Sequence, residues 1–260
     1  MAIITLTSDW GTKDHYLASV KGAILAQISD INIIDISHEI APFDLNQASY
    51  ILRNVWESFP EGSIHIVGVN SEASPEHPHI LIKEKGQYFI GADNGIFSLI
   101  FDHSPQEIYE LDIIQSSSKF TFSTKDVFVQ VAKHIVEGKD LEELGEKLTE
   151  LTKRVAFQPV TEANLIKGKI IYIDRYENVV TNISEKLFYD TCGKKKYQIL
   201  LSAGKYKINK VRSSYSDVGE GELVALFGSD GLLEIAQNRG RAAGLLGLQL
   251  DDVVRIEIEE

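Results

Sequence analysis

The chain has 260 residues, of which 43% are apolar and 25% charged, and this composition excludes a disordered protein. Its formal net charge of −12 disfavours nucleic acid as a partner, because an acidic surface repels phosphate backbones. Cys192 is the single cysteine, which excludes an internal disulfide and a cysteine-based metal cluster.

The first part of the chain alternates between strand and helix patterns. Short, apolar, β-branched segments predict strands, and apolar residues at helical spacing predict helices. The strands fall at 2–7, 32–37 and 63–69, and the helices at 15–27 and 45–55. This order predicts an α/β domain with a central, mainly parallel sheet. A hairpin is expected next, at 79–91, and a helix at 127–136.

The pattern changes near residue 155. Short alternating segments follow, separated by glycine or charged turns, and they predict a smaller all-β barrel. We therefore expect an α/β domain over 1–158 and the β-barrel domain over 166–260. No apolar run approaches the ~20 residues of a membrane helix, and the first residues lack a secretory signal. We expect a cytoplasmic protein without a membrane partner.

Several polar residues follow the predicted strands of the α/β domain. Asp9 stands where the first strand stops, a place where carboxylates often bind ribose, although a helix N-cap is as common. Asp14 is similarly either a ligand group or a first-turn carboxylate. The histidines at 38, 77 and 79 fit no standard zinc motif. Loop polar groups satisfied by the backbone are the favoured interpretation, and no metal site is predicted.

The predicted barrel has one polar cluster, at residues 174–178. It combines the Asp174 carboxylate, the Tyr176 ring and the Asn178 amide, and Tyr215 offers a second ring. An aromatic face can stack on a purine, and an amide can bind its hydrogen-bonding edge. Taken alone, a hairpin turn beside a tyrosine at the edge of the core is the favoured interpretation.

Six ordered segments together resemble one family. They are TLTSDWGTKDHYLASVKG, DISHEIAPFDLNQASYIL, FPEGSIHIVGV, YFIGADNGIFS, YIDRYENVVTNI and GSDGLLEIAQN. The chain is similar over nearly its whole length to the adenosine-forming S-adenosyl-L-methionine (SAM) hydrolases, the hydroxide adenosyltransferases related to bacterial fluorinase and chlorinase. The resemblance implies an α/β domain followed by a β-barrel, with SAM as the substrate or ligand and no cofactor. It also implies a homotrimer, with each site between the N-terminal domain of one subunit and the C-terminal domain of the next.

The resemblance also assigns roles to individual residues. Asp9 matches the aspartate that binds the ribose hydroxyls, and Phe43 stands beside the ribose. The adenine would lie between Tyr176 and Tyr215, with its edge bound by Asn178. The groups around the two ends of the methionine moiety would be Asp14, Asp174 and Ser229.

The water-activating positions depart from the family pattern. The aspartate, arginine and histidine of the hydrolases are replaced by Asn70, His77 and Ser123. An asparagine cannot accept a proton, so the expected base is His77 or Glu72. Thr124 matches the serine that contacts halide in the halogenases.

These replacements leave three functions open. The first is hydrolysis of SAM to adenosine and L-methionine by attack of water at C5′. The second is a catalytically silent protein that binds SAM or adenosine, and the third is a halide-using adenosyltransferase. A further departure is Asp230, where the halogenases have an arginine near the methionine carboxylate.

Overall fold

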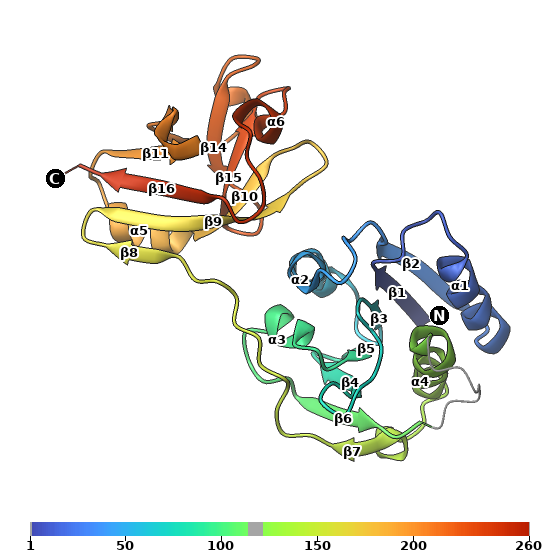
Figure 1. Cartoon of the computed structure of the whole chain (residues 1–260). Coiled ribbons are helices and arrows are strands. Elements are labelled where there is room, and N and C mark those ends of the chain that lie inside the picture. Colours follow the sequence, from blue (N-terminus) through green and yellow to red (C-terminus); the bar gives the residue numbers. More distant parts are fainter. Residues whose placement is uncertain (1, 114–121, 260) are drawn as a thin grey trace. The chain divides into compact units, whose positions relative to one another are not determined.

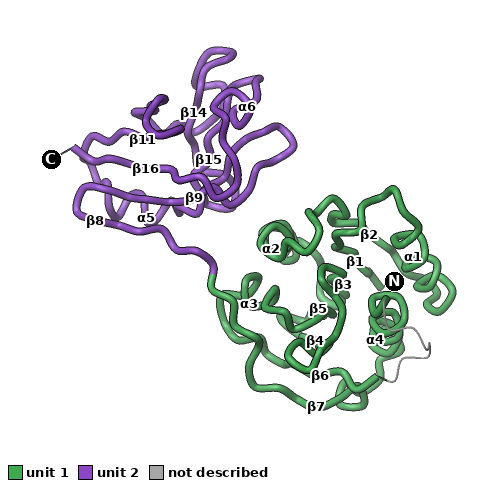
Figure 2. Tube along the Cα trace, in the orientation of Figure 1, with its two compact units in different colours: residues 1–155 green, residues 156–260 purple. Residues whose placement is uncertain are grey.

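The computed structural model of the chain describes residues 2–113 and 122–259. These form two compact units, residues 1–155 and 156–260, coloured separately in Figure 2. No helix of the described residues has the length and apolarity needed to cross a membrane.

Unit 1 is built on a seven-stranded sheet in the order β2-β1-β3-β5-β4-β6-β7 among its described residues. Its strands are β1 (Ala2–Ser8), β2 (Ile31–Ser37), β3 (Ile64–Gly68), β4 (His79–Glu84), β5 (Gln87–Ala92), β6 (Glu107–Leu111) and β7 (Gly145–Lys147). Its helices are α1 (Tyr16–Gln27), α2 (Leu45–Arg53), α3 (Ile96–Ile100) and α4 (Val129–Val136), with short helical turns η1 (Trp56–Ser58), η2 (Thr124–Phe128) and η3 (Leu141–Leu144).

The prediction of a mainly parallel sheet is wrong, because this sheet is mixed. β1 pairs in parallel with β2 and β3, and β3 with β5, whereas β4 pairs antiparallel with β5 and β6, and β6 with β7. The cause is the predicted hairpin, which is confirmed. Lys85 and Gly86 both have positive φ angles, 46° and 70°, as a tight two-residue hairpin turn requires. The hairpin inserts β5 beside β3, so β4 necessarily runs in the opposite direction.

Helices cover both faces of this sheet (Figure 1). Leu81 and Ile90 contribute to the apolar layer under α1 and α4, whereas their neighbours Ile80, Ile82 and Phe89 contribute to the layer under α2 and α3. Alternate residues of a strand point to opposite faces, so strands buried on both faces are apolar throughout.

Unit 2 is an all-β sheet with two short helices. Its described strands are β8 (Val160–Glu162), β9 (Leu165–Ile173), β10 (Val179–Ser184), β11 (Tyr197–Leu201), β12 (Tyr206–Ile208), β13 (Val211–Arg212), β14 (Leu223–Phe227), β15 (Leu232–Gln237) and β16 (Val253–Ile258). The helices are α5 (Glu185–Cys192) and α6 (Ala242–Leu246), and the short turns are η4 (Ser202–Gly204) and η5 (Tyr215–Asp217).

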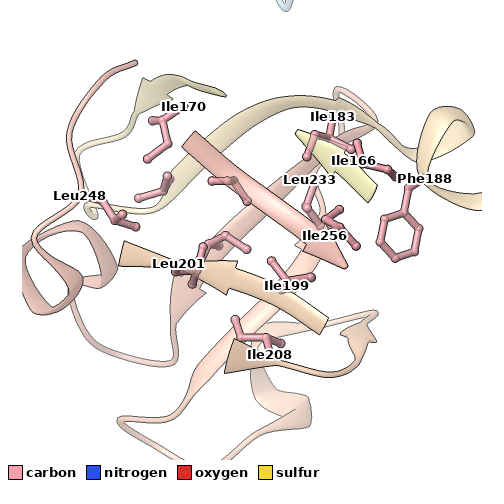
Figure 3. Close-up of a cluster of buried hydrophobic side chains, with 14 of the residues drawn as sticks. Ile166, Ile170, Ile183, Phe188, Ile199, Leu201, Ile208, Leu233, Leu248 and Ile256 are labelled. Carbon is pink, nitrogen blue, oxygen red and sulfur yellow. The ribbon is translucent and has the colours of Figure 1, made fainter. Parts of the chain in front are cut away.

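The strand order of unit 2 is β12-β11-β16-β9-β10-β15-β14-β13, with β8 added on β9. β12 also lies close to β14, so the sheet curls almost into a barrel. Its inward-facing side chains form one apolar cluster, which includes Ile166, Ile199, Leu233, Ile256 and the ring of Phe188 (Figure 3).

Candidate functional site

The ends of four strands of unit 1 meet at one edge of its sheet. β1, β2, β3 and β5 are parallel along the sheet, so their carboxyl ends lie on the same side, and the antiparallel β4 starts there. In open α/β sheets this edge is where ligands bind. Polar groups gather at it from Asp9, His38, Asn70, His77 and Asp93.

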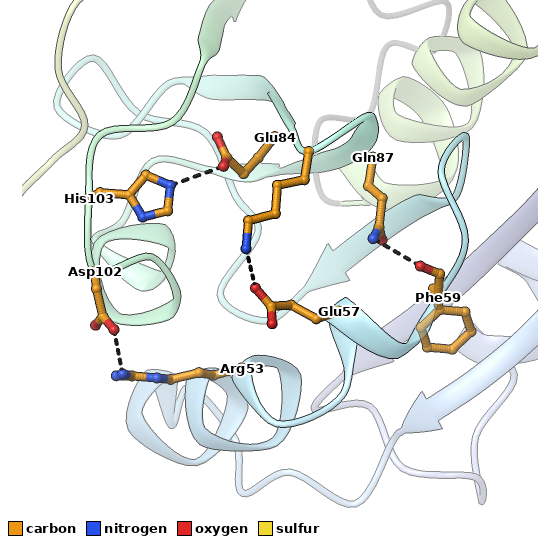
Figure 4. Close-up of polar contacts among 8 residues, drawn as sticks. Arg53, Glu57, Phe59, Glu84, Gln87, Asp102 and His103 are labelled. Atoms are coloured by element: carbon orange, nitrogen blue, oxygen red, sulfur yellow. Dashed lines mark hydrogen bonds and ion pairs between the residues drawn. The ribbon is translucent and has the colours of Figure 1, made fainter. Parts of the chain in front are cut away.

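The opposite edge has a different character. There Glu84 accepts a hydrogen bond of 3.0 Å from His103 (Figure 4) and one of 2.9 Å from the backbone of Gln106. Lys85 pairs with Glu57 beside them. These contacts join the β4–β5 turn to its surroundings. They lie away from every residue that the sequence marks for binding or catalysis.

Asp9 holds the loop of a neighbouring strand. Its Oδ2 accepts a hydrogen bond of 2.8 Å from the backbone N–H of Phe43, which has a φ of 65° and is 71% exposed. Asp9 is not a helix N-cap, because α1 begins after His15. Asp14 is exposed and precedes the first turn of that helix, so the alternative of a first-turn carboxylate is wrong as well.

The loop after β3 is held from beneath by Asn94. Its buried side-chain amide donates to the carbonyl oxygens of Val69 and Asn70, at 3.3 and 2.9 Å. Asn70 has a φ of 46°, a left-handed conformation that asparagine tolerates better than most residues. Its side chain is exposed, as is that of Glu72.

His77 is half-buried, and one of its ring nitrogens is assigned by its partner. Nδ1 lies 3.0 Å from the carbonyl oxygen of Asp93. Because a carbonyl only accepts, Nδ1 carries the proton of the neutral ring and Nε2 has the free lone pair. In this tautomer Nε2 is the nitrogen that can accept a proton.

His79 is arranged in the opposite way. Its Nε2 donates to the carbonyl oxygen of Ser71 at 2.9 Å, and its ring packs edge-on against Phe128. Burial lowers the pKa of His79, and the backbone contact opposes this only in part. His79 is therefore a neutral clamp on the loop. The interpretation that loop histidines are satisfied by backbone groups is confirmed for His77 and His79.

The segment that starts η2 lies against the same loop. Thr124 is fully buried, and its hydroxyl lies 3.1 Å from that of Ser71. Ser123 is also buried. The indole of Trp10 covers Gly68 next to Thr124, and a β-carbon at residue 68 would lie 2.4 Å from that indole. The structure thus brings Thr124 and Trp10, the residue that follows Asp9, to the end of β3.

In unit 2 the predicted hairpin turn at 174–178 is present. Asp174 accepts hydrogen bonds from the backbone and side-chain nitrogens of Asn178, at 2.8 and 3.1 Å. Tyr176 stands at the tip and is 75% exposed. The Asp174 carboxylate therefore fixes the orientation of the Asn178 amide.

Tyr215 lies beside a group that sequence reasoning missed. Its hydroxyl donates to Glu234 on β15 at 2.8 Å, and burial together with this carboxylate raises the pKa of Tyr215 to about 12. Burial raises the pKa of Glu234 too, and the charges of Asp174 and Asp230 add to that rise. Asp230, in the turn that also exposes Ser229, accepts from the backbone of Leu232. Unit 2 thus groups Asp174, Tyr215, Asp230 and Glu234.

The sequence reasoning had no signal for Glu234 or Asn94. Both contacts join residues that are far apart in the chain, and neither residue type is unusual in its segment.

Fold and candidate site together define a two-unit protein, with an α/β unit that gathers polar groups at its strand ends and a nearly closed β-barrel that presents exposed tyrosines. Residues 4–145 match the family model of the SAM hydroxide adenosyltransferase N-terminal domain, and residues 168–255 match that of the C-terminal domain. The chain belongs to the SAM hydroxide adenosyltransferase family.

Individual relatives agree with this assignment. A protein of Methanocaldococcus jannaschii named (R)-S-adenosyl-L-methionine hydrolase is 33% identical, over 98% of this chain and 95% of its own length. A protein of the same name from Thermus thermophilus is 28% identical over 98% and 100%. A fluorinase of Nocardia brasiliensis is 25% identical over 98% and 97%. The crystal structure of an uncharacterized conserved protein from Thermotoga maritima superposes with a TM-score of 0.87 at 31% identity, over 98% and 99% of the two chains.

Proposed function

We propose that this chain hydrolyses SAM to adenosine and L-methionine by attack of water at C5′. The observation that carries the proposal is the match of both units to the SAM hydroxide adenosyltransferase domains, together with full-length relatives named SAM hydrolase. A catalytically silent binding protein is less well supported, because the family match extends over both units.

The chemistry asks little of the protein beyond positioning. The leaving group is a neutral thioether that departs from a sulfonium, so it needs no protonation. The protein has to hold water in line with C5′ and remove a proton from it. Asn70 cannot accept that proton, and Ser123 is no base.

His77 is the base that the geometry supports best. The Asp93 carbonyl holds Nδ1 in its protonated form, which leaves the Nε2 lone pair available to the water. Glu72 is the second candidate, and it is exposed on the same loop. Asn70 would orient the water through its side-chain amide.

Nucleoside binding would use groups from both units. Asp9 would bind the ribose hydroxyls beside Phe43, because a carboxylate can accept two hydrogen bonds from a diol. Tyr176 and Tyr215 would stack on the adenine, and Asn178 would bind its edge. Asp14, Asp174 and Ser229 would surround the methionine moiety. We propose a homotrimer in which unit 1 of one subunit and unit 2 of its neighbour share each substrate.

The test follows adenosine by chromatography from purified protein and SAM between pH 6 and 9. We expect release above the buffer rate, and a loss of about 10²–10⁴-fold in kcat for His77→Ala. Glu76→Gln, on the same loop but with no proposed role, is the matched control. A larger loss in Glu72→Gln than in His77→Ala would transfer the role of base to Glu72.

Two other results would contradict hydrolysis. SAM binding in calorimetry without adenosine release would establish a silent binding protein. A product that changes when chloride, bromide or fluoride is added would establish a halide-using enzyme, with Thr124 as the first residue to vary.

Light scattering that gives a monomer mass would reject the homotrimer.

A further inference from the structure

A line of four polar side chains runs beneath the Asp9 loop. Lys21 of α1 pairs with Asp35 of β2 at 2.6 Å, and Asp35 Oδ1 lies 3.1 Å from Nε2 of His38. Nδ1 of His38 lies 2.6 Å from the hydroxyl of Ser8. Partial burial opposes ionisation of Asp35, but Lys21 and His38 outweigh it, so the pKa of Asp35 is lowered. Asp35 is thus a charged anchor for the His38 ring.

The ring of His38 is held by these two neighbours rather than by backbone groups. Its Nε2 is buried and lies 3.1 Å from the Asp35 carboxylate, but not in the geometry of a well-directed hydrogen bond. The expectation that a backbone group satisfies this histidine is therefore wrong. A buried polar ring tied to two side chains has a fixed orientation.

Ser8, His38 and Asp35 resemble a nucleophilic triad in composition, but they cannot act as one. Ser8 is 1% exposed and His38 4% exposed, so no substrate reaches the serine hydroxyl. The three side chains therefore act on their surroundings and not on a reacting group.

His38 grips the chain on both sides of Asp9. Its ring contacts Ser8, the residue before Asp9, and its backbone carbonyl accepts a hydrogen bond of 2.8 Å from the N–H of Gly11. Asp9 in turn holds the backbone of Phe43 at 2.8 Å. The loops after β1 and β2 are therefore joined on either side of the Asp9 carboxylate.

We propose that His38 is a positioning residue that orients the Asp9 carboxylate for a vicinal diol, and so sets the preference for a ribose over a deoxyribose. The inference rests on the proposed function, because it takes the ribose as the ligand of Asp9. The physical reason is that a carboxylate binds two adjacent hydroxyls only when its plane is fixed. If the loop that carries Asp9 loosens, the preference for ribose over deoxyribose is lost before the overall affinity for nucleosides, because stacking of the adenine does not depend on Asp9.

Calorimetry of adenosine and 2′-deoxyadenosine tests this without any turnover. The wild type should bind adenosine about 10- to 100-fold more tightly, as expected for one hydrogen bond to a charged group. His38→Leu should reduce this ratio to below about threefold while leaving the affinity for 2′-deoxyadenosine within about twofold. His38→Asn, which keeps a polar atom near the position of Nδ1, should retain most of the ratio. His103→Leu, at the opposite edge of the sheet, is the matched control and should keep the wild-type ratio.

Several other outcomes would count against the proposal. Equal losses for both nucleosides in His38→Leu would show a merely structural role, and an unchanged ratio would show no role. Ser8→Ala removes only the contact to the ring, so its ratio decides the matter if His38→Leu does not fold. Asp9→Asn must abolish the preference, and a wild type without a preference, or without nucleoside binding, also overturns the proposal. A wild type that prefers adenosine over 2′-deoxyadenosine but releases no adenosine from SAM would refute hydrolysis alone. The role of His38 would then still be decided by the ratio of the two affinities in His38→Leu.

Discussion

His65 offers a sharp test of how unit 1 is held together, because it is a fully buried histidine with both ring nitrogens in use. Nε2 lies 2.7 Å from the side-chain oxygen of Gln87, whose amide nitrogen donates to the carbonyl of Phe59. Nε2 is therefore the donor, and Nδ1 accepts from the hydroxyl of Thr5 at 2.8 Å. The ring also stacks on Phe89. This environment is complete for a neutral imidazole.

Protonation of His65 should weaken unit 1. Burial lowers the pKa of His65 from 6.5 to about 4, only partly opposed by Gln87. Between these values the unfolded chain binds more protons than the folded one, so stability falls as the pH falls. A difference of about 2.5 pKa units corresponds to about 3 kcal/mol in the free energy of unfolding of unit 1. This stability is lost as the pH falls below 6.5, and the loss is almost complete near pH 4.

The measurement compares the wild type with His65→Phe, which keeps the stacking and removes the titrating group. Both tryptophans, Trp10 and Trp56, lie in unit 1, so their fluorescence during denaturant unfolding reports this unit alone. The variant should be less stable at pH 7.5, because Thr5 and Gln87 lose a partner. The difference in free energy of unfolding between the wild type and the variant should be about 2–3 kcal/mol smaller at pH 4.5 than at pH 7.5. A deficit that stays constant with pH would refute the reasoning.

Three further predictions concern other parts of the chain. Glu84→Gln should destabilise unit 1 by about 1–2 kcal/mol in tryptophan-monitored unfolding, because the buried carboxylate accepts hydrogen bonds from two donors. Lys85→Met is the control and should change this unfolding little, because it breaks only an exposed ion pair. Phe188→Ala should lower the free energy of unfolding of unit 2 by about 3–5 kcal/mol, measured by tyrosine near-ultraviolet circular dichroism during denaturant unfolding. An equal loss of stability in the unfolding followed by tryptophan fluorescence, which reports unit 1, would contradict this prediction. Asp230→Asn should lower the KM for SAM by about two- to tenfold with kcat retained, because it removes a charge that repels the substrate carboxylate, and an unchanged KM would place that carboxylate elsewhere.

Local patterns in the sequence predict where strands and helices lie but not how the strands are ordered. The hairpin of β4 and β5 follows from its alternation and its Lys85-Gly86 turn. Nothing in either strand says that β5, rather than β4, pairs with β3, because both are apolar on both faces. The error about a mainly parallel sheet has this origin.

The candidate site shows the same limit. Asp9 and the loop at 70–79 are recognisable because each follows an apolar strand, and strand ends are where ligands bind. The groups that hold them are not recognisable. Asn94 reaches Asn70 across 24 residues, and Glu234 reaches Tyr215 across 19, through contacts that only the folded sheets create. Periodicity describes single elements, whereas these contacts depend on how elements pack.

The proposed use of His77 as the base, in place of a carboxylate at residue 70, is compatible with hydrolysis once two magnitudes are compared. A general base typically contributes about 10²–10⁴-fold, whereas fixing two reactants in line corresponds to effective molarities of about 10⁵–10⁸ M. The contacts that fix the loop are present, since Asn94 holds Asn70 and His79 holds Ser71. The loop at residues 70–79 is therefore held by contacts of its own, as the proposed positioning of water would require. Under the proposed function, positioning would supply the larger contribution to rate, and His77, with its lone pair at Nε2, would supply only the smaller one.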